Sequence, residues 1–285
     1  MKGIILAAGR GTRLYPITRP VCKPLLPVYD KPLIYYPLSV LIQAGIREVL
    51  IIVPPGEEDT FAALLGDGSQ LGMSIRYAVQ PVARGIADAL LIGEEALGGD
   101  DVCLVLGDNI FWAPDLSQQL RQAAEQNDGA TVFGCRVADP RPFGVVEFGP
   151  DGKAISIEEK PARPKSNYII PGLYFYDRQA MDIAAHLTPS PRGELEITDV
   201  NLAYLRENRL KVIPLESGYL WKDAGTADTL LDTAQCIANL QQDLHLYVGC
   251  IEEEAWKAGF ISRDQLHRLG EDMKMTPYGQ RLASL

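Results

Sequence analysis

The sequence predicts an α/β fold in which a mostly parallel central sheet is covered by helices on both faces. Short apolar runs rich in Val, Ile and Leu alternate with helical patterns through the first half of the chain. This alternation is typical of right-handed crossovers between parallel strands. The chain has 285 residues, of which 47% are hydrophobic, enough for one large domain or two modest ones.

The elements of the first half follow from these patterns in order. The expected strands are Lys2–Ala7, Val49–Val53, Ile75–Val79, Val102–Leu106 and Thr131–Cys135. The expected helices between them are Leu38–Ala44, Asp59–Leu65, Ile86–Leu97 and Asp115–Gln126, and Gly45 is a C-cap signal. The arrangement is Rossmann-like, and ligands of such sheets bind beyond the carboxyl ends of the strands.

The second half of the chain changes character. Strand-like segments around the turn signal Pro150-Asp151-Gly152 predict an antiparallel insertion that meets the main sheet, at Val145–Phe148, Ala154–Glu159 and Leu173–Tyr176. Helices are expected at Glu196–Glu207 and Ala227–Leu240, followed by two short amphipathic helices between Glu252 and Arg268. We therefore expect one compact unit, with a core over residues 1–241 and a C-terminal helical extension over residues 242–285.

Charge and composition exclude several classes of protein. The net charge is −10, and such an acidic balance argues against a nucleic-acid partner. The chain opens with no charged-then-apolar leader, and no apolar run approaches the ~20 residues of a membrane span. Its five cysteines are scattered without a Cys-x-x-Cys pair, which favours reduced thiols. We expect a cytoplasmic protein with no membrane segment.

A glycine loop follows the first strand and predicts a phosphate site. In Ala8-Gly9-Arg10-Gly11-Thr12-Arg13-Leu14, the glycines allow successive N–H groups to form a nest for anionic oxygens. Arg10, Arg13, Arg19 and Lys23 follow without an acidic residue before Asp30. An ordinary strand-loop with solvated arginines is the alternative.

The loop matches neither common phosphate-binding fingerprint. A P-loop needs Gly-Lys-Ser/Thr after its second glycine, and Gly11-Thr12-Arg13 does not supply it. Leu14 stands where a dinucleotide-binding loop has its third glycine. The second mismatch argues against a Rossmann-like oxidoreductase.

Two carboxylates far apart in the sequence are candidate metal ligands. Asp108 directly follows the buried strand Val102–Leu106, and Asp223 lies between a strand end and the start of a helix. Mg²⁺ typically takes one or two carboxylates together with phosphate oxygens and water. Asp108 as a turn residue and Asp223 as a helix cap are the structural alternatives.

An ordered series of motifs resembles the sugar-phosphate nucleotidyltransferases. The glycine loop and Lys23-Pro24-Leu25-Leu26-Pro27 carry the resemblance first. Further blocks extend it over nearly the whole chain: Tyr29–Leu38, Leu65–Gly68, Leu106–Phe111, Phe143–Phe148, Glu158–Pro161, Gly172–Asp177 and Arg192–Thr198. Together they are most similar to the short glucose-1-phosphate thymidylyltransferases.

The resemblance implies an enzyme that transfers a nucleotidyl group from dTTP to α-D-glucose 1-phosphate, giving dTDP-glucose and pyrophosphate. Arg13 and Lys23 would be the catalytic cations, and Mg²⁺ would be held by Asp108 and Asp223. The nucleotide would lie against Leu6, Ala8, Gly9, Gly11, Thr12, Arg13, Lys23, Gln80, Gly85 and Asp108. The sugar phosphate would lie against Gly144, Glu159, Lys160, Ile170 and Arg192. Without the resemblance, Glu159 and Lys160 would read as a surface ion pair and Arg192 as a solvated loop residue.

The resemblance also implies a homotetramer acting in dTDP-rhamnose biosynthesis. The end product would bind a second site near Trp112-Ala113-Pro114 and Glu252–Trp256, where Pro114 and Glu254 depart from the family. Other departures are Ala8 in the glycine loop, Pro171, and Lys222 and Ala224 around Asp223. A further departure is Ala83-Arg84 with Asp88, which we expect beside the base and sugar pockets.

These departures leave two other classes open. One is a uridylyl- or other nucleotidyltransferase using a different hexose 1-phosphate on the same scaffold. The other is a regulatory paralogue that binds a nucleotide-sugar without turnover. Retention of Arg13, Lys23, Asp108 and Asp223 together argues against the second, because a sensor does not need all four.

Overall fold

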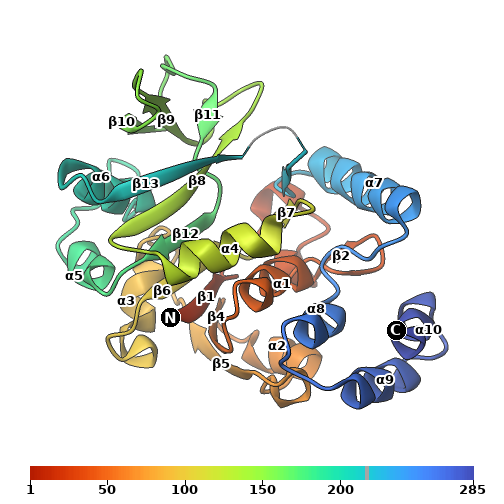
Figure 1. Ribbon diagram of the computed structural model, residues 1–285. Coiled ribbons are helices and arrows are strands. Elements are labelled where there is room, and N and C mark those ends of the chain that lie inside the picture. Colours follow the sequence, from red (N-terminus) through yellow and green to blue (C-terminus); the bar gives the residue numbers. More distant parts are fainter. Residues whose placement is uncertain (216–217) are drawn as a thin grey trace.

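A computed structural model describes residues 1–215 and 218–285, and its centre is a ten-stranded sheet (Figure 1). The strand order is β10-β9-β11-β8-β12-β6-β1-β4-β5, with β13 paired to β8. One half is parallel and consists of β1 (Lys2–Leu6), β4 (Glu48–Val53), β5 (Ser74–Val79) and β6 (Val102–Leu106). The predicted mostly parallel α/β sheet is confirmed in this half.

Alternating side chains bury both faces of the parallel half. Ile5, Ile51 and Val105 point into one apolar core, while Ile4 and Ile52 point into the other. The first core is closed by α1 (Tyr35–Gln43), α2 (Glu58–Leu65) and α4 (Leu116–Glu125). The second is closed by α3 (Asp88–Leu97), α5 (Gln179–Ala185) and α6 (Ile197–Arg206). Period-two burial on both faces explains why these strands read as continuous apolar runs.

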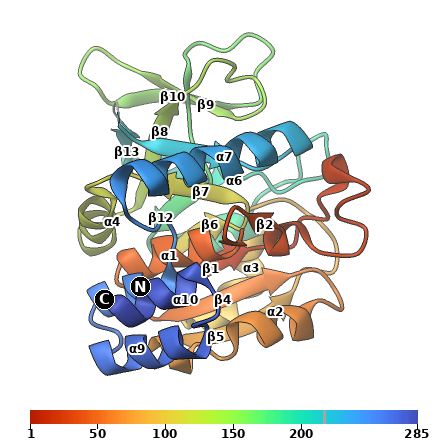
Figure 2. The same ribbon diagram turned by 90° about the vertical axis from the view of Figure 1, so that its right-hand side faces the viewer.

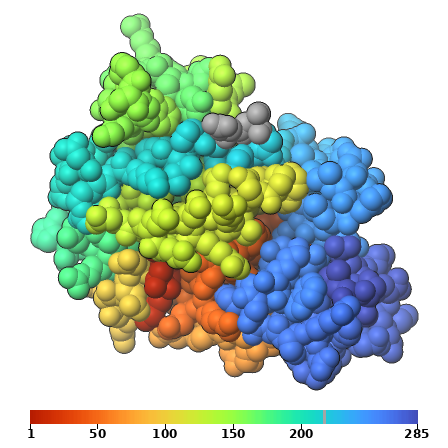
Figure 3. Space-filling view, in the orientation of Figure 1, coloured from red at the N-terminus to blue at the C-terminus, as the bar shows by residue number. Residues whose placement is uncertain are grey.

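The other half of the sheet is mixed. In it β12 (Leu173–Tyr176) runs antiparallel to both β6 and β8 (Ala130–Arg136). The insertion of β9 (Gly144–Phe148), β10 (Ala154–Glu159) and β11 (Tyr168–Ile169) is antiparallel throughout. Its first two strands agree with the sequence prediction, but the third expected segment, Leu173–Tyr176, is β12 of the main sheet, and β11 takes its place in the insertion. Figure 3 shows the insertion standing above the rest of the molecule.

Two small sheets complete the part of the fold that carries the site. The first pairs β7 (Asn109–Trp112) with β14 (Leu220–Asp223), and its register sets Asp223 opposite Asn109. The second is the hairpin of β2 (Pro27–Val28) and β3 (Lys31–Pro32), which precedes α1. Pairing of β7 with β14 therefore brings two segments more than a hundred residues apart to one edge of the main sheet.

Four helices follow the last strand: α7 (Ala227–Leu244), α8 (Ile251–Lys257), α9 (Arg263–Asp272) and α10 (Pro277–Ser284). Of these α8 packs on α1, α9 on α8 and α10 on α9, while α7 packs on β14 and β2 (Figure 2). Because α7 continues to Leu244, the expected boundary after residue 241 falls inside a helix. No helix in the described part of the chain is long and apolar enough to cross a membrane.

Several helices and strands of the structure are not predicted by the sequence patterns. The helices α5 and α10 are too short for a clear period, and β7 and β11 have only four and two residues. The strand β13 (Leu210–Leu215) contains Pro214, which lacks an N–H and argues against a central strand. The structure places β13 at an edge, paired only with β8, where a proline is tolerated.

Candidate active site

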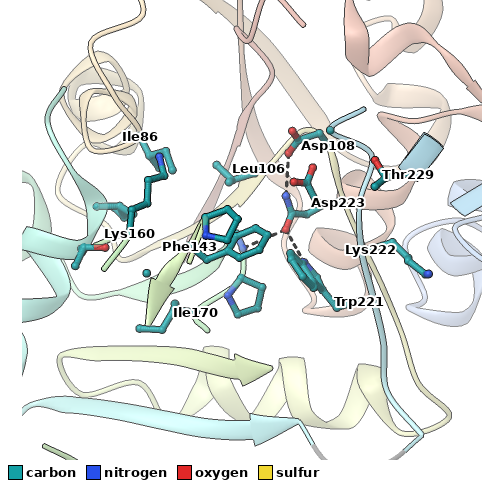
Figure 4. Close-up of a pocket in the computed structure, with 18 of the residues that line it drawn as sticks. Ile86, Leu106, Asp108, Phe143, Lys160, Ile170, Trp221, Lys222, Asp223 and Thr229 are labelled. Carbon is teal, nitrogen blue, oxygen red and sulfur yellow. Dashed lines mark hydrogen bonds between the residues drawn. The ribbon is translucent and has the colours of Figure 1, made fainter. Parts of the chain in front are cut away.

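Two adjoining cavities lie at the carboxyl ends of β1 and β6. The larger has a volume of about 840 Å³ and extends from Asp108 and Asp223 to the β9–β10 insertion (Figure 4). The smaller, of about 150 Å³, lies between the glycine loop, Lys23 and Gly107. Leu106 and Asp108 line both cavities. Asp108 therefore stands at the junction of two compartments, as the switch-point rule for such sheets predicts.

A lysine lies between the two predicted metal ligands. Lys23 Nζ is 2.5 Å from Asp108 Oδ2 and 3.7 Å from Asp223 Oδ1. The lysine is only 6% exposed, so its charge needs these carboxylates as partners. The two aspartates meet although 115 positions separate them. Asp108 lies in the turn between β6 and β7, as its structural alternative expects, and both its carboxylate oxygens accept hydrogen bonds. Asp223 is not the cap of the following helix, because Thr226 caps α7.

Asp223 carries a charge that the protein compensates incompletely. Its Oδ1 atom is buried without a hydrogen-bond partner among the described residues. Burial, and next the charge of Asp108, raise the pKa of Asp223, while Lys23 and Arg13 oppose the rise. A buried acceptor of this kind favours an additional cation beside it.

Local backbone geometry positions Lys23 under the glycine loop. Gly11 has a φ of 60°, and a Cβ there would lie 3.1 Å from Lys23 Cβ and 3.0 Å from Thr18 Cγ2. Thr18 Oγ1 donates a hydrogen bond of 2.7 Å to the Gly11 carbonyl oxygen. Only glycine fits this close approach without displacing the lysine.

Asn109 is a site residue to which sequence reasoning assigned no role. Its Nδ2 donates to Asp108 Oδ1 at 2.8 Å, and its Oδ1 accepts from Trp221 Nε1 at 2.7 Å (Figure 4). The Gly172 amide donates to the same Oδ1 at 3.2 Å. Asn109 thereby fixes the orientation of Asp108, and its buried position directly after the candidate aspartate is the signal that could have identified it.

The insertion supplies the far wall of the larger cavity. Gly144, Glu159, Lys160 and Ile170 all line it, so four of the five predicted sugar-phosphate residues come together. Thr198 donates a hydrogen bond to Glu159 Oε2, and a Cβ on Gly144 would approach Thr198 Oγ1 to 3.0 Å. Lys160 and Ile86 lie across the cavity from Asp223 and Trp221 (Figure 4).

Arg192 does not line either cavity. Its Nη2 atom lies 2.8 Å and 2.9 Å from the two carboxylate oxygens of Glu196, and 3.5 Å from Glu159. The side chain remains 40% exposed. Arg192 is therefore near the predicted sugar-phosphate residues but already bound to carboxylates.

The nucleotide residues divide between the two cavities. Leu6, Gly9, Lys23 and Asp108 line the smaller cavity, and Arg13 lines the larger. The remaining predicted residues line neither: Ala8, Gly11, Thr12, Gln80 and Gly85. Gln80 follows β5, two strands from the glycine loop, and Ala8, Gly11 and Thr12 belong to that loop itself.

Asp88 does not reach the sugar side of the site, contrary to expectation. It is 1% exposed at the start of α3 and does not line either cavity. Its carboxylate accepts hydrogen bonds from Gln80 and Arg84 instead. A buried charge requires such partners, which is why this carboxylate turns toward an amide and a guanidinium.

The sheet, the glycine loop and the paired carboxylates define a nucleotidyltransferase. The profile of the nucleotidyl transferase family matches residues 2–239. Glucose-1-phosphate thymidylyltransferases of Neisseria meningitidis and Mycolicibacterium smegmatis are 54% and 51% identical over 285 residues, which is all of this chain and 99% of each relative. The chain belongs to the glucose-1-phosphate thymidylyltransferase family.

Solved structures agree with this assignment. A Bacillus anthracis structure, assigned to the same family and solved with sucrose, is 42% identical with a TM-score of 0.77. The match covers 83% of this chain and 94% of that one. A UDP-glucose pyrophosphorylase solved with UDP-glucose is 22% identical with a TM-score of 0.73, over 84% and 98% of the two chains. The second likeness concerns the fold alone.

Proposed function

We propose that this protein transfers a thymidylyl group from dTTP to α-D-glucose 1-phosphate, releasing dTDP-glucose and pyrophosphate. The relatives that match over the full length carry this activity in their names. The observation that carries the proposal within this chain is the cluster of Lys23, Asp108 and Asp223 where the two cavities meet. The reacting α-phosphate would lie at that junction.

The reaction is a single in-line displacement. A phosphate oxygen of the sugar phosphate forms a bond to the α-phosphorus of dTTP, and the bond from that phosphorus to the leaving pyrophosphate oxygen breaks. Both reactants are anions, so the protein supplies cations and alignment rather than a nucleophile. Lys23 and Arg13 carry that positive charge. The attacking phosphate is already ionised near neutral pH, so no general base is required.

The two aspartates fit a Mg²⁺ ion. Within residues 1–215 and 218–285 no cluster of three metal-ligating side chains occurs, and Mg²⁺ bound with a nucleotide needs only one or two carboxylates. The buried, unpartnered Asp223 Oδ1 supports this assignment. A Mg²⁺ ion there would supply charge stabilisation to phosphate oxygens.

Each of the two substrates would bind to its own group of predicted site residues. The nucleotide phosphates would lie along the glycine loop, with Leu6, Ala8, Gly9, Gly11 and Thr12 against them and Gln80 and Gly85 toward the base. Gly144, Glu159 and the backbone at Ile170 would bind the sugar hydroxyls. Lys160 and Arg192 would bind the sugar phosphate, and Arg192 must then exchange its contact with Glu196 for one with phosphate.

The active molecule would be a homotetramer that works in the cytoplasm on small-molecule substrates. All five cysteines are unpaired, which supports a reducing compartment. The residues that line the cavities and the family relationship argue against a nucleic-acid partner.

A substrate panel tests the proposed function. Pyrophosphate release is measured with dTTP, UTP, ATP and GTP, each against glucose 1-phosphate and several other hexose 1-phosphates. We expect dTTP with glucose 1-phosphate to give the highest kcat/KM and UTP to be a measurable second, since one methyl group is worth only about 1–3 kcal/mol. A purine triphosphate in first place would contradict the proposal. Nucleotide-sugar binding without any turnover would identify a regulatory paralogue.

A further inference from the structure

Three side chains outside both cavities form a hydrogen-bond network centred on Asp88, at the carboxyl end of β5. Asp88, the first residue of α3, is 1% exposed, and Gln80 is 6% exposed. Gln80 Nε2 donates to Asp88 Oδ2 at 2.8 Å, and Arg84 Nη2 lies 2.6 Å from Asp88 Oδ1. The N-terminal end of α3 adds favourable backbone dipoles around the carboxylate.

This network determines which end of the Gln80 amide faces away from Asp88. An ionised carboxylate only accepts hydrogen bonds, so the amide nitrogen must face it. The same Nε2 lies 3.4 Å from the Gly85 carbonyl oxygen. Both directed contacts of the amide nitrogen are therefore with protein acceptors, and no described residue donates a hydrogen bond to Gln80 Oε1.

The Gln80 backbone is fixed as well. Its N–H donates to the Val53 carbonyl oxygen at 3.0 Å, which ties it to the end of β4. Gln80 follows β5, two strands from β1 and its glycine loop, so the separation is roughly 10 Å. A nucleotide separates its phosphate from the pairing edge of its base by a comparable distance.

We infer that Asp88, held by Arg84, is a positioning residue that presents the carbonyl oxygen of Gln80 to the nucleotide base. The inference rests on the proposed function, because it requires a nucleotide on the glycine loop. An amide oxygen accepts a hydrogen bond from the N3–H of thymine or uracil. Cytosine has an unprotonated acceptor at N3, so two acceptors would oppose each other. The Asp88–Gln80 pair thus selects thymine and uracil against cytosine.

Replacing the carboxylate by an amide tests the inference. In Asp88→Asn the new side chain offers either a donor or an acceptor, so the Gln80 amide is free to turn over. We expect the ratio of kcat/KM for UTP to that for CTP to fall about tenfold or more, mainly through KM for CTP. Asp88→Glu, which remains a pure acceptor, should keep most of the discrimination. Glu95→Gln removes an exposed charge from the same helix and should leave the ratio unchanged.

A second measurement needs no variant at Asp88. In 3-deaza-CTP a C–H group replaces N3, which removes the acceptor that would oppose Gln80 Oε1. Competition against dTTP on the wild-type protein should show 3-deaza-CTP binding several-fold more tightly than CTP. Equal or weaker binding of 3-deaza-CTP would overturn the inference, as would an unchanged UTP-to-CTP ratio in a folded Asp88→Asn enzyme. Failure of the wild-type protein to turn over dTTP or UTP would instead refute the proposed function.

Discussion

At the scale of single residues, the site pairs buried charges of opposite sign in the cluster of Lys23, Asp108 and Asp223. One buried ammonium group faces two carboxylates, and Asn109 holds one of them in place. The cluster is unbalanced, since Asp223 Oδ1 has no hydrogen-bond partner among the described residues. This excess of negative charge favours binding of a further cation together with a phosphate ligand.

Removing either carboxylate charge should disable the enzyme. Asp108→Asn and Asp223→Asn should each lower kcat by orders of magnitude at saturating Mg²⁺, because the metal ligand is lost. Binding of Mn²⁺ with dTTP, followed by electron paramagnetic resonance, should weaken in parallel. Near-native circular dichroism and melting would show that the fold persists. Turnover within a few-fold of wild type in both variants would contradict the metal assignment.

The basic residues should separate into two kinetic groups. Lys23→Ala and Arg13→Ala should mainly lower kcat, because their charges matter most as charge redistributes at the α-phosphorus. Lys160→Ala and Arg192→Ala should mainly raise KM for glucose 1-phosphate, leaving KM for dTTP nearly unchanged. Steady-state kinetics with each substrate varied in turn measures both effects. The reverse pattern would exchange the roles of the two groups.

A polar core fixes the C-terminal helices at the scale of the element. Lys31 Nζ lies 5.3, 5.8 and 5.7 Å from the ring centroids of Tyr36, Tyr247 and Tyr278. Tyr278 in turn donates a hydrogen bond to Glu252, which is 5% exposed on α8. Cation–π contacts and buried hydrogen bonds thus join β3, α8 and α10.

Glu252 makes the stability of this extension depend on pH. Burial raises the pKa of Glu252, although the hydrogen bond from Tyr278 and the charge of Lys31 oppose the rise. A raised pKa means that the contribution of Glu252 to stability is complete below its unfolded pKa and is lost as pH rises through its folded pKa. The free energy of unfolding is therefore lower at neutral pH than at acid pH because of Glu252.

Glu252→Gln should accordingly raise Tm at pH 7. The expected gain is roughly 0.5–2 kcal/mol, since Gln still accepts the Tyr278 hydrogen bond without a buried charge. Melting curves between pH 3.5 and 8 should show the gain shrinking as pH falls through the raised folded pKa, and smallest below about pH 4.3, the usual pKa of an unfolded-chain Glu. Glu253→Gln is the matched control and should lower Tm, because it loses ion pairs to Lys257 at 2.9 Å and Arg281 at 3.2 Å. A lower Tm for Glu252→Gln at pH 7 would mean that attraction to Lys31 dominates.

At the scale of the whole molecule, the extension borders a third cavity. A hollow of about 470 Å³ lies between α4 and α8 and is lined by Arg121, Glu254 and Lys257 among others. It is close in sequence to the segments Trp112–Pro114 and Glu252–Trp256, where the family resemblance implies a second nucleotide-sugar site. Its charged lining residues balance, Arg121 and Lys257 against Glu125 and Glu254, and Glu254 already pairs with Lys257 at 3.4 Å, so the hollow offers an anion no net positive charge.

We therefore expect a tetramer with weak or altered end-product inhibition. Light scattering should give the mass of four chains, and dTDP-rhamnose should inhibit poorly at a site distinct from the substrates. Glu254→Leu should strengthen that inhibition without changing kcat/KM for glucose 1-phosphate. A monomer in solution would refute the assembly, and strong inhibition of the unaltered protein at a distinct site would refute the regulatory half.

Local patterns determined much of this molecule from the sequence alone. Strands such as Val49–Val53 and Val102–Leu106 are apolar on both faces, and only a sheet covered on both sides buries such runs. The glycine loop, Asp108 and Asp223 were identifiable because each breaks an apolar or regular segment with a polar group.

Tertiary structure alone decided the partners of these groups. Pairing of β7 with β14 brings Asp223 to Asp108, and no local pattern specifies that pairing. The orientation of Asp88 toward Gln80 and the binding of Arg192 by Glu196 depend on which carboxylates the fold buries. Sequence periodicity reports which face of an element is apolar, whereas a buried charge takes its partner from whatever distant segment the fold brings within hydrogen-bond distance.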